Sequence, residues 1–192
     1  MKTREEFQSW LQLLDLGDSP DEARYRDQML ELLAAQKDCF LRNCFPAHFT
    51  ASALVLSGDG SRTLLTHHHF LDRWLQFGGH CDGEVDTLAS ALREAEEESG
   101  IGHLTPVQAF PIDLDIHLIP ANPKRGEPAH FHYDVRFLLR APREAVPRLS
   151  DESKELRWFT PDEMHALCDE EGLRRLVRKW RRVASLRMTK PE

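Results

Sequence analysis

A short acidic stretch, REAEEESG at residues 93–100, constrains this 192-residue chain more than any other segment. The residues around it predict a helix from about residue 86 to Ser99, with Gly100 as its C-terminal cap. Glu94 and Glu98 stand four residues apart, and like charges at that spacing destabilise a helix by roughly 0.2–0.5 kcal/mol. The fold must therefore supply something that compensates for this crowding of carboxylates.

A helical wheel separates the four carboxylates into two groups. Glu94, Glu97 and Glu98 fall beside the apolar arc, whereas Glu96 points to the opposite side, toward solvent. Carboxylates at the margin of a core repel one another and take up protons unless a cation such as Mg²⁺, which favours oxygen ligands, lies among them. The helix alone leaves a solvated acidic face open as the alternative. The core-facing arc holds Leu88, Ala91, Leu92 and Ala95.

A double glycine precedes this helix. Glycine lets the backbone approach a ligand closely, and Gly78-Gly79 ends an extended stretch that leads into the acidic helix. From Gly79 to Ile101 the sequence resembles the Nudix box of the Nudix hydrolases: a glycine, five residues, a glutamate, seven residues, and R-E-U-x-E-E-x-G-U, in which U is apolar. The one mismatch is Val85, which stands where the box has its first glutamate, between Glu84 and Asp86.

The resemblance extends over about residues 47–165, and it implies a fold and an activity. The implied fold is α/β, a Nudix-like α/β/α sandwich with a central mixed sheet. The implied activity is hydrolysis of a nucleoside diphosphate linked to another moiety, with Mg²⁺ or Mn²⁺ as cofactor and water attacking phosphorus. The substrate would be a small-molecule nucleotide. Metal ligands implied by the resemblance are Gly79, Glu94, Glu97 and Glu98.

The resemblance also implies catalytic roles for Arg93, Glu97 and Glu98. Arg93 adjoins the carboxylate arc, so we expect it to position carboxylates by bidentate pairing; direct contact with phosphate is the alternative. Glu152 and Glu155 stand just before a predicted last strand, where either could supply a further ligand or the general base. The alternative for both is an exposed loop acid.

The rest of the chain predicts a helical extension over residues 1–45 and a Nudix domain over residues 46–192, C-terminal helices included. In the extension, a capping box at Ser19-Pro20-Asp21-Glu22 opens a helix that is predicted to run to about Leu41. Strands are predicted at 49–57, 63–69, 73–80, 107–120, 129–141 and 155–160, and helices from Thr160-Pro161 and at about 170–186.

Ten histidines are many for a chain of this length. His130 and His132 lie on the same face of a predicted strand, and His80 follows the double glycine. These three predict a second site for a metal or a phosphate, with surface histidines as the alternative.

His80 also suggests a rival family. Isopentenyl-diphosphate isomerase has Cys-Gly-His where this chain has Gly78-Gly79-His80, but the catalytic cysteine is absent and Cys81 is displaced by three positions. Without that thiol, proton transfer at carbon lacks its agent. A Nudix-fold module that binds a ligand without turnover is the third alternative; retention of Glu94, Glu97 and Glu98 favours catalysis.

Composition indicates which kinds of binding partner and which cellular location to expect. The net charge of −7, from 25 basic and 32 acidic residues, argues against nucleic-acid binding. No apolar run is long enough to span a membrane, and the N-terminal segment is too charged for a signal peptide. The four cysteines form no C-x-x-C pair and predict reduced thiols in a cytoplasmic protein. Many Nudix proteins dimerise, and the sequence leaves a homodimer open.

Overall fold

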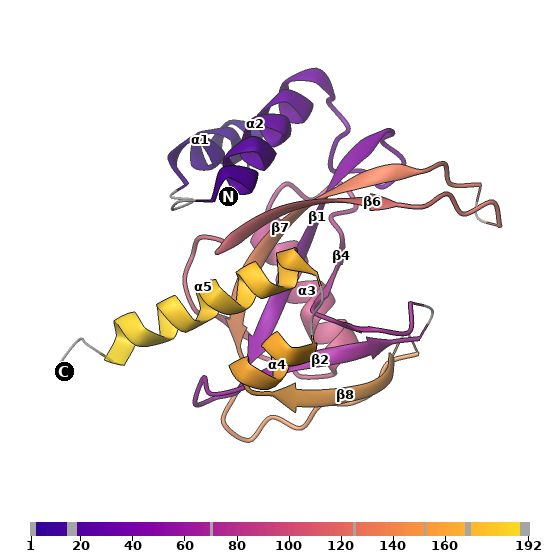
Figure 1. Ribbon diagram of the computed structural model, residues 1–192. Coiled ribbons are helices and arrows are strands. Elements are labelled where there is room, and N and C mark those ends of the chain that lie inside the picture. The colour runs from indigo at the N-terminus through magenta and orange to yellow at the C-terminus, as the bar shows by residue number, and fades with distance from the viewer. Residues whose placement is uncertain are drawn as a thin grey trace.

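The computed structural model describes residues 3–14, 19–69, 71–124, 126–151, 153–167 and 170–188. Within these ranges one mixed sheet is flanked by helices (Figure 1). The elements in chain order are α1 (Arg4–Leu13), α2 (Pro20–Ala35), β1 (Ala47–Leu56), β2 (Thr63–His68), β3 (Trp74–Leu75), β4 (Phe77–His80), α3 (Thr87–Ser99), β5 (Thr105–Pro106), β6 (Asp113–Ile119), β7 (His130–Arg140), β8 (Ser153–Phe159), α4 (Pro161–Leu167) and α5 (Glu171–Met188).

Strand β1 is the centre of the sheet. It runs parallel to β7, in register from Ala47 opposite Phe131 to Leu56 opposite Arg140. On its other side it pairs antiparallel with β4 and then with β2, which in turn pairs with β3 and β8. Strands β5 and β6 pair antiparallel with β7. The sheet is therefore mixed, as the sequence predicts.

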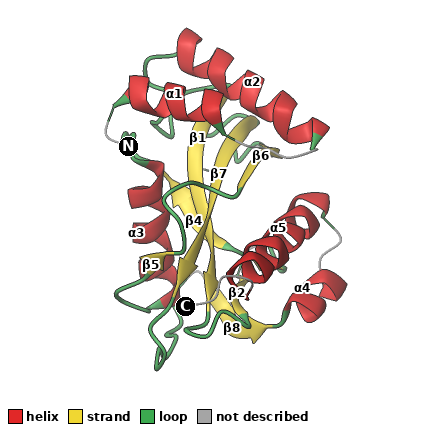
Figure 2. Ribbon diagram, turned by 90° about the vertical axis from the view of Figure 1, so that its left-hand side faces the viewer, coloured by secondary structure: helices red, strands yellow, loops and turns green. Residues whose placement is uncertain are grey.

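Helices cover both faces of this sheet (Figure 2). Helix α3 packs on one face, where Ala91 and Ala95 meet Phe49 and Ala51 of β1 in a core that also includes Phe7 of α1. Helices α4 and α5 cover the other face, in a second core with alternate residues of the same strands, such as Leu54. Strand β1 is buried along its whole length, as expected for a central strand covered on both sides.

The second helix is shorter than predicted. Ser19 caps α2 as expected, accepting a hydrogen bond from the Glu22 N–H at 3.4 Å, but the helix ends at Ala35 rather than near Leu41. The guanidinium of Arg4 ends it, donating hydrogen bonds to the carbonyl oxygens of Leu33 (2.5 Å) and Gln36 (2.9 Å). These terminal carbonyls therefore have a partner without a further helical turn.

Glu22 does not complete the predicted capping box. Its carboxylate is fully buried and accepts a hydrogen bond from the Leu114 N–H at 3.2 Å. A complete capping box instead opens α4: the Thr160 N–H donates to Glu163 Oε2 at 2.7 Å, and the Glu163 N–H donates to Thr160 Oγ1 at 3.3 Å.

Two predicted strands differ from the observed ones. The extended stretch at 73–80 is divided into β3 and β4 by Gln76, and the stretch at 107–120 forms strand β6 only from Asp113. Cys39 and Cys44 lie in the non-helical segment between α2 and β1. Together with Cys81 they are free, buried thiols, while Cys168 lies outside the described residues. None of the described helices combines the length and apolar character that a transmembrane span requires.

Candidate active site

Helix α3 begins and ends where the sequence predicts. The Asp86 side chain accepts a hydrogen bond from the Ala89 N–H at its start, and Gly100, with φ of 65°, adopts the left-handed conformation at its end. The buried face is made of small residues rather than leucines, and Leu88 and Leu92 are only half-buried. Small side chains let α3 lie close to β4 and β1. The buried residues of α3 are Thr87, Ser90, Ala91, Ala95 and Ser99.

The closest contact between α3 and β4 joins Glu94 to Gly79. A Cβ placed on Gly79 would lie 2.6 Å from Oε2 of Glu94, so a side chain at residue 79 would collide with the carboxylate. The Glu94 side chain is only 15% exposed. Two members of the predicted metal site, 15 residues apart in the sequence, are thus in direct contact, and the glycine is required by that contact.

Arg93 connects the same two elements. Its Nη1 donates a hydrogen bond to Glu94 Oε1 at 2.7 Å and lies 3.7 Å from Glu97 Oε2. Its Nη2 donates to the backbone carbonyl of His80 at 2.8 Å. The guanidinium therefore holds the carboxylate arc of α3 against the end of β4, in the arrangement expected of a residue that positions carboxylates.

The carboxylates of this arc are in an environment in which a bound cation would be favourable. Burial raises the pKa of the Glu94 carboxyl; the charge of Arg93 opposes this effect, and nearby Glu97 adds to it. Glu97 is 63% exposed, and Glu98 is partly exposed. A divalent cation among these oxygens would stabilise the ionised form of Glu94, and carboxylates are the donor type that Mg²⁺ and Mn²⁺ prefer. The donor set therefore fits the implied metal.

Glu96 differs from the prediction. It is half-buried rather than solvated, and its Oε1 accepts a hydrogen bond from the Leu104 N–H at 3.0 Å. This bond ties the loop after α3 back to the helix. A wheel cannot show this contact, because the loop that follows the helix determines it.

The acids that flank the mismatch at Val85 are engaged locally. Glu84 Oε1 accepts the Asp86 N–H at 2.9 Å, and Asp86 caps α3. Glu155 is exposed on β8, opposite His67 of β2, so it joins the sheet two strands away from β1. Glu152 lies outside the described residues.

The predicted histidines gather on one face of the sheet. His130 and His132 are two residues apart on β7 and therefore share a face, and their ring centroids are 5.2 Å apart. The centroid of the His80 ring lies 5.2 Å from that of His132. The structure adds His48, which pairs in register with His132 across the parallel strands β1 and β7. Sequence spacing missed His48, because nothing local shows which strand β1 pairs with.

Burial and neighbouring charged groups lower the pKa of three of these imidazoles, those of His48, His80 and His132. Burial, together with the surrounding histidines, lowers the pKa of His132 to about 2. Burial and Arg42 lower the pKa of His80 to about 4, and burial also lowers that of His48. His48, His80 and His132 are therefore neutral imidazoles at neutral pH.

Comparison with known proteins decides the family. A model of the NUDIX domain matches residues 46–180. The chain belongs to the NUDIX family. This confirms the family predicted from residues 79–101.

Two curated relatives of this NUDIX chain carry the names of hydrolases. The "Probable DHNTP pyrophosphohydrolase" of Lactococcus lactis subsp. cremoris (strain MG1363) is 31% identical over 90 residues, which are 47% of this chain and 52% of the relative. The "m7GpppN-mRNA hydrolase NUDT17" of Homo sapiens is 30% identical over 133 residues, 62% of this chain and 40% of the relative. The chain thus spans about half or less of the length of each.

Solved structures agree on the fold. A C. elegans Ap4A hydrolase in a binary complex aligns with a TM-score of 0.58 at 19% identity, over 71% of this chain and 97% of that one. The E. coli dihydroneopterin triphosphate pyrophosphohydrolase aligns with a TM-score of 0.53 at 19% identity, over 68% and 92%. The predicted α/β fold of Nudix type is therefore confirmed.

Proposed function

We propose that this NUDIX chain is a metal-dependent pyrophosphohydrolase that cleaves a nucleoside diphosphate linked to another moiety. The observation that carries the proposal is the contact of Glu94 with Gly79, braced by Arg93, because it brings the glycine, the arginine and a glutamate of the box together at one place. The names of both curated relatives support hydrolysis of a phosphoric anhydride.

Gly79, Glu94, Glu97 and Glu98 would hold Mg²⁺ or Mn²⁺. When bound, the ion neutralises the diphosphate and lowers the pKa of a coordinated water. Glu97 is exposed and Glu98 is partly exposed, so in this proposal one of these two carboxylates takes the proton from the attacking water. Arg93 fixes the Glu94 carboxylate against β4, and Gly79 leaves the space that this carboxylate fills.

Two observations weigh against the isopentenyl-diphosphate isomerase alternative. Gly78 has φ of +155°, and a Cβ there would lie 2.3 Å from Cβ of Ser52, so a cysteine has no space at that position. The thiol of Cys81, three positions later in the sequence, is buried, and burial raises its pKa to about 12. A thiol with that pKa supplies almost no thiolate at neutral pH.

We also propose a small-molecule substrate and a cytoplasmic location. The acidic net charge of −7 opposes binding to a nucleic-acid backbone, and the described cysteines are free thiols, which suits a reducing compartment.

A substrate panel tests the proposal. Purified protein is assayed with Mg²⁺ and with Mn²⁺ against dihydroneopterin triphosphate, dinucleoside polyphosphates, nucleoside triphosphates, ADP-ribose, nucleotide sugars, a cap dinucleotide and isopentenyl diphosphate. Metal-dependent release of phosphate, pyrophosphate or a nucleotide product, lost in Glu97→Gln and Glu98→Gln, is expected. Ligand binding without turnover of any compound would instead support a binding module, and conversion of isopentenyl diphosphate alone would support the isomerase.

A further inference from the structure

Three histidines outside the carboxylate arc form a compact group of potential metal ligands. His48 of β1 and His130 and His132 of β7 each offer one ring nitrogen, and these nitrogens all lie within 4.8 Å of one another. His48 and His130 are 1% and 4% exposed. Side chains two residues apart on a strand share a face, and β1 pairs with β7 in register at His48 and His132, so the backbone itself brings the rings together.

The hydrogen bonds of two of these rings fix their tautomers. His48 Nδ1 lies 3.2 Å from the carbonyl oxygen of Cys44, and His130 Nδ1 lies 2.8 Å from that of Pro128. A carbonyl only accepts, so each Nδ1 carries the proton and each Nε2 is left with its lone pair. A metal-bound imidazole is oriented in this way, by a carbonyl at its other nitrogen.

Two further ring nitrogens of this group lack a hydrogen-bond partner among the described residues. His48 Nε2 and His132 Nε2 are buried and accept no hydrogen bond from any group that the structure describes. Leaving a buried polar atom without a hydrogen bond is unfavourable, so two such atoms side by side on one sheet face point to a ligand that binds both.

We propose that His48, His130 and His132 bind a transition-metal ion of the Zn²⁺ type through their Nε2 atoms. Imidazole suits Zn²⁺, Cu²⁺, Fe²⁺ and Ni²⁺, whereas Mg²⁺ prefers oxygen, so this site and the carboxylate arc select different ions. In a tetrahedral centre with Zn–N of 2.0–2.1 Å the nitrogens lie about 3.4 Å apart, so small rotations of the rings close the site. Three protein ligands leave the fourth position open to water, an anion or a further residue.

His80 lies beside two of the proposed ligands, His48 and His132. Its ring centroid lies 5.3 Å from that of His48 and 5.2 Å from that of His132. His80 and Gly79 are neighbours on β4, so they face opposite sides of the sheet. Because Glu94 contacts Gly79, the proposed histidine site lies on the opposite face of the sheet from Glu94. The His80 carbonyl accepts a hydrogen bond from Arg93. An ion at the histidines would therefore steady the strand end against which the carboxylate arc is held.

The experiment measures metal binding without any substrate. The purified full-length chain is stripped with a chelator and titrated with Co²⁺ and Zn²⁺ in excess Mg²⁺, and visible absorption and metal content are recorded. The wild type is expected to bind one ion per chain and to give the Co²⁺ absorption typical of tetrahedral nitrogen coordination. His48→Gln and His132→Gln should each weaken binding by at least about 100-fold, because even outer partners of a metal ligand contribute 10–100-fold.

The matched control is His165→Gln, since His165 is exposed on α4 and should leave binding unchanged. Thermal unfolding with and without Zn²⁺ guards against misfolding: Zn²⁺ should raise the Tm of the wild type and of His165→Gln but not that of the folded His48 and His132 variants. If one of these fails to fold, His130→Gln takes its place. Absence of tight Zn²⁺ binding in the wild type, or full binding in the ligand variants, would overturn the proposal.

The proposal is independent of the hydrolase activity. Glu97→Gln should bind Zn²⁺ as the wild type does, and a failure to find a substrate would leave the metal content of the histidine site unchanged. Loss of Zn²⁺ binding in Glu97→Gln would show that the ion sits at the carboxylates, and this too would overturn the proposal.

Discussion

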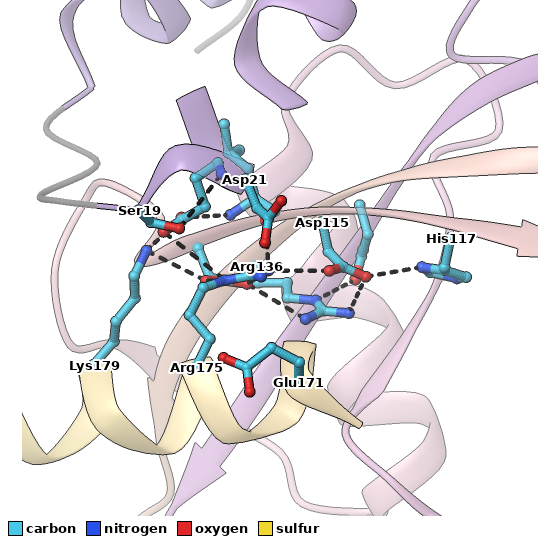
Figure 3. Close-up of polar contacts among 12 residues, drawn as sticks. Ser19, Asp21, Asp115, His117, Arg136, Glu171, Arg175 and Lys179 are labelled. Atoms are coloured by element: carbon cyan, nitrogen blue, oxygen red, sulfur yellow. Dashed lines mark hydrogen bonds and ion pairs between the residues drawn. The ribbon is translucent and has the colours of Figure 1, made fainter. Parts of the chain in front are cut away.

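Two acidic clusters of this protein contrast in how their charges are balanced. One is the carboxylate arc of α3, Glu94, Glu97 and Glu98, with Arg93 beside it. The other is a buried ionic network between α2, β6, β7 and α5 (Figure 3). The network consists of Glu22, Asp113, Asp115, Asp134, Arg136, Arg175 and Lys179.

Arg136 is the centre of the network. Its side chain is 6% exposed and donates to Asp134 (Nε, 2.9 Å), Asp115 (Nη2, 2.8 Å) and Asp113 (Nη1, 3.3 Å). Arg175, on α5, adds hydrogen bonds to Asp113 at 2.7 and 2.9 Å. Each of these three carboxylates therefore has an arginine partner, as buried charges require.

Glu22 extends the network to the N-terminal helices. Its buried carboxylate pairs with Lys179 of α5 and accepts the Leu114 N–H of β6. Helices from the two ends of the chain are thus joined to one strand. Glu22 and Lys179 are 157 residues apart in the sequence.

The comparison shows that a group of carboxylates does not by itself identify a metal site, because positively charged side chains can balance the carboxylates instead. Burial opposes ionisation of Asp115, but Arg136 and its other partners hold the pKa of that carboxyl well below its usual range, whereas the pKa of Glu94 is raised. The network is closed by its arginines. In the arc, Arg93 pairs with Glu94 at 2.7 Å and lies 3.7 Å from Glu97, and the arc is partly exposed.

The largest effect expected from this comparison is on catalysis. Glu98→Gln should lower kcat by about 10²–10⁴-fold, the usual contribution of a general base or acid, while changing the free energy of unfolding by no more than about 1 kcal/mol. Steady-state kinetics and urea unfolding measure the two quantities. Glu96→Gln is the matched control, because an amide oxygen can still accept the Leu104 N–H; equal loss of activity in both variants would contradict the assignment of the arc.

The network should instead respond in stability. Arg136→Met removes the arginine partner of buried Asp134 and one of the partners of Asp113 and of Asp115, so it should lower the free energy of unfolding by about 3–5 kcal/mol. Urea unfolding gives this value. Arg178→Met is the control, since the exposed Arg178–Glu171 pair should contribute at most about 1 kcal/mol. A loss at Arg136 no larger than at Arg178 would mean that the network is not structural.

A smaller catalytic effect is expected at the contact between the two elements. In Gly79→Ala the new Cβ displaces the flexible end of Glu94, so kcat should fall by up to about 10²-fold, as for a misplacement of 1 Å. Thermal melting should show little change, because Gly79 does not have a positive φ. Gly102→Ala, where no atom lies within 4 Å of the new Cβ, is the control. If kcat and KM are unchanged in Gly79→Ala, the position of Glu94 does not matter for catalysis, which would contradict its assignment to the active site.

The smallest effect concerns pH. Asp115 has a lowered pKa in the folded state, so it contributes stability that is present above its unfolded pKa of about 3.9 and is lost as pH falls toward the folded value. Asp115→Asn should therefore flatten the decline of unfolding free energy below about pH 5. Urea unfolding at a series of pH values measures this slope. An unaltered slope in the variant would show that Asp115 is not part of the acid response.

What the sequence could predict was local. The box from Gly79 to Ile101 predicts its own helix, caps and family, because these depend on residues within a few turns of one another. Asp86 and Gly100 end α3 through contacts with their immediate neighbours. The family match then carries the rest of the fold.

What it could not predict depends on distant partners. The end of α2 depends on Arg4, which precedes Leu33 by 29 residues. The buried carboxylate of Glu22 depends on its pairing with Lys179. His48 meets His132 only because β1 and β7 pair in parallel, with most of the domain between them. The sequence around each of these residues predicts a different role for it, because the partner that determines its role is brought close only by the fold.

The most direct test of the central claim is the binding of Mn²⁺, followed by the electron paramagnetic resonance signal of the free ion. The wild type, Glu97→Gln of the arc and Asp115→Asn of the network are titrated after each is shown to be folded. Glu97→Gln should weaken Mn²⁺ binding by at least about 10-fold, because a hard ion loses a carboxylate ligand, and Asp115→Asn should leave it unchanged. Unaltered binding in Glu97→Gln, or loss in Asp115→Asn alone, would contradict the account.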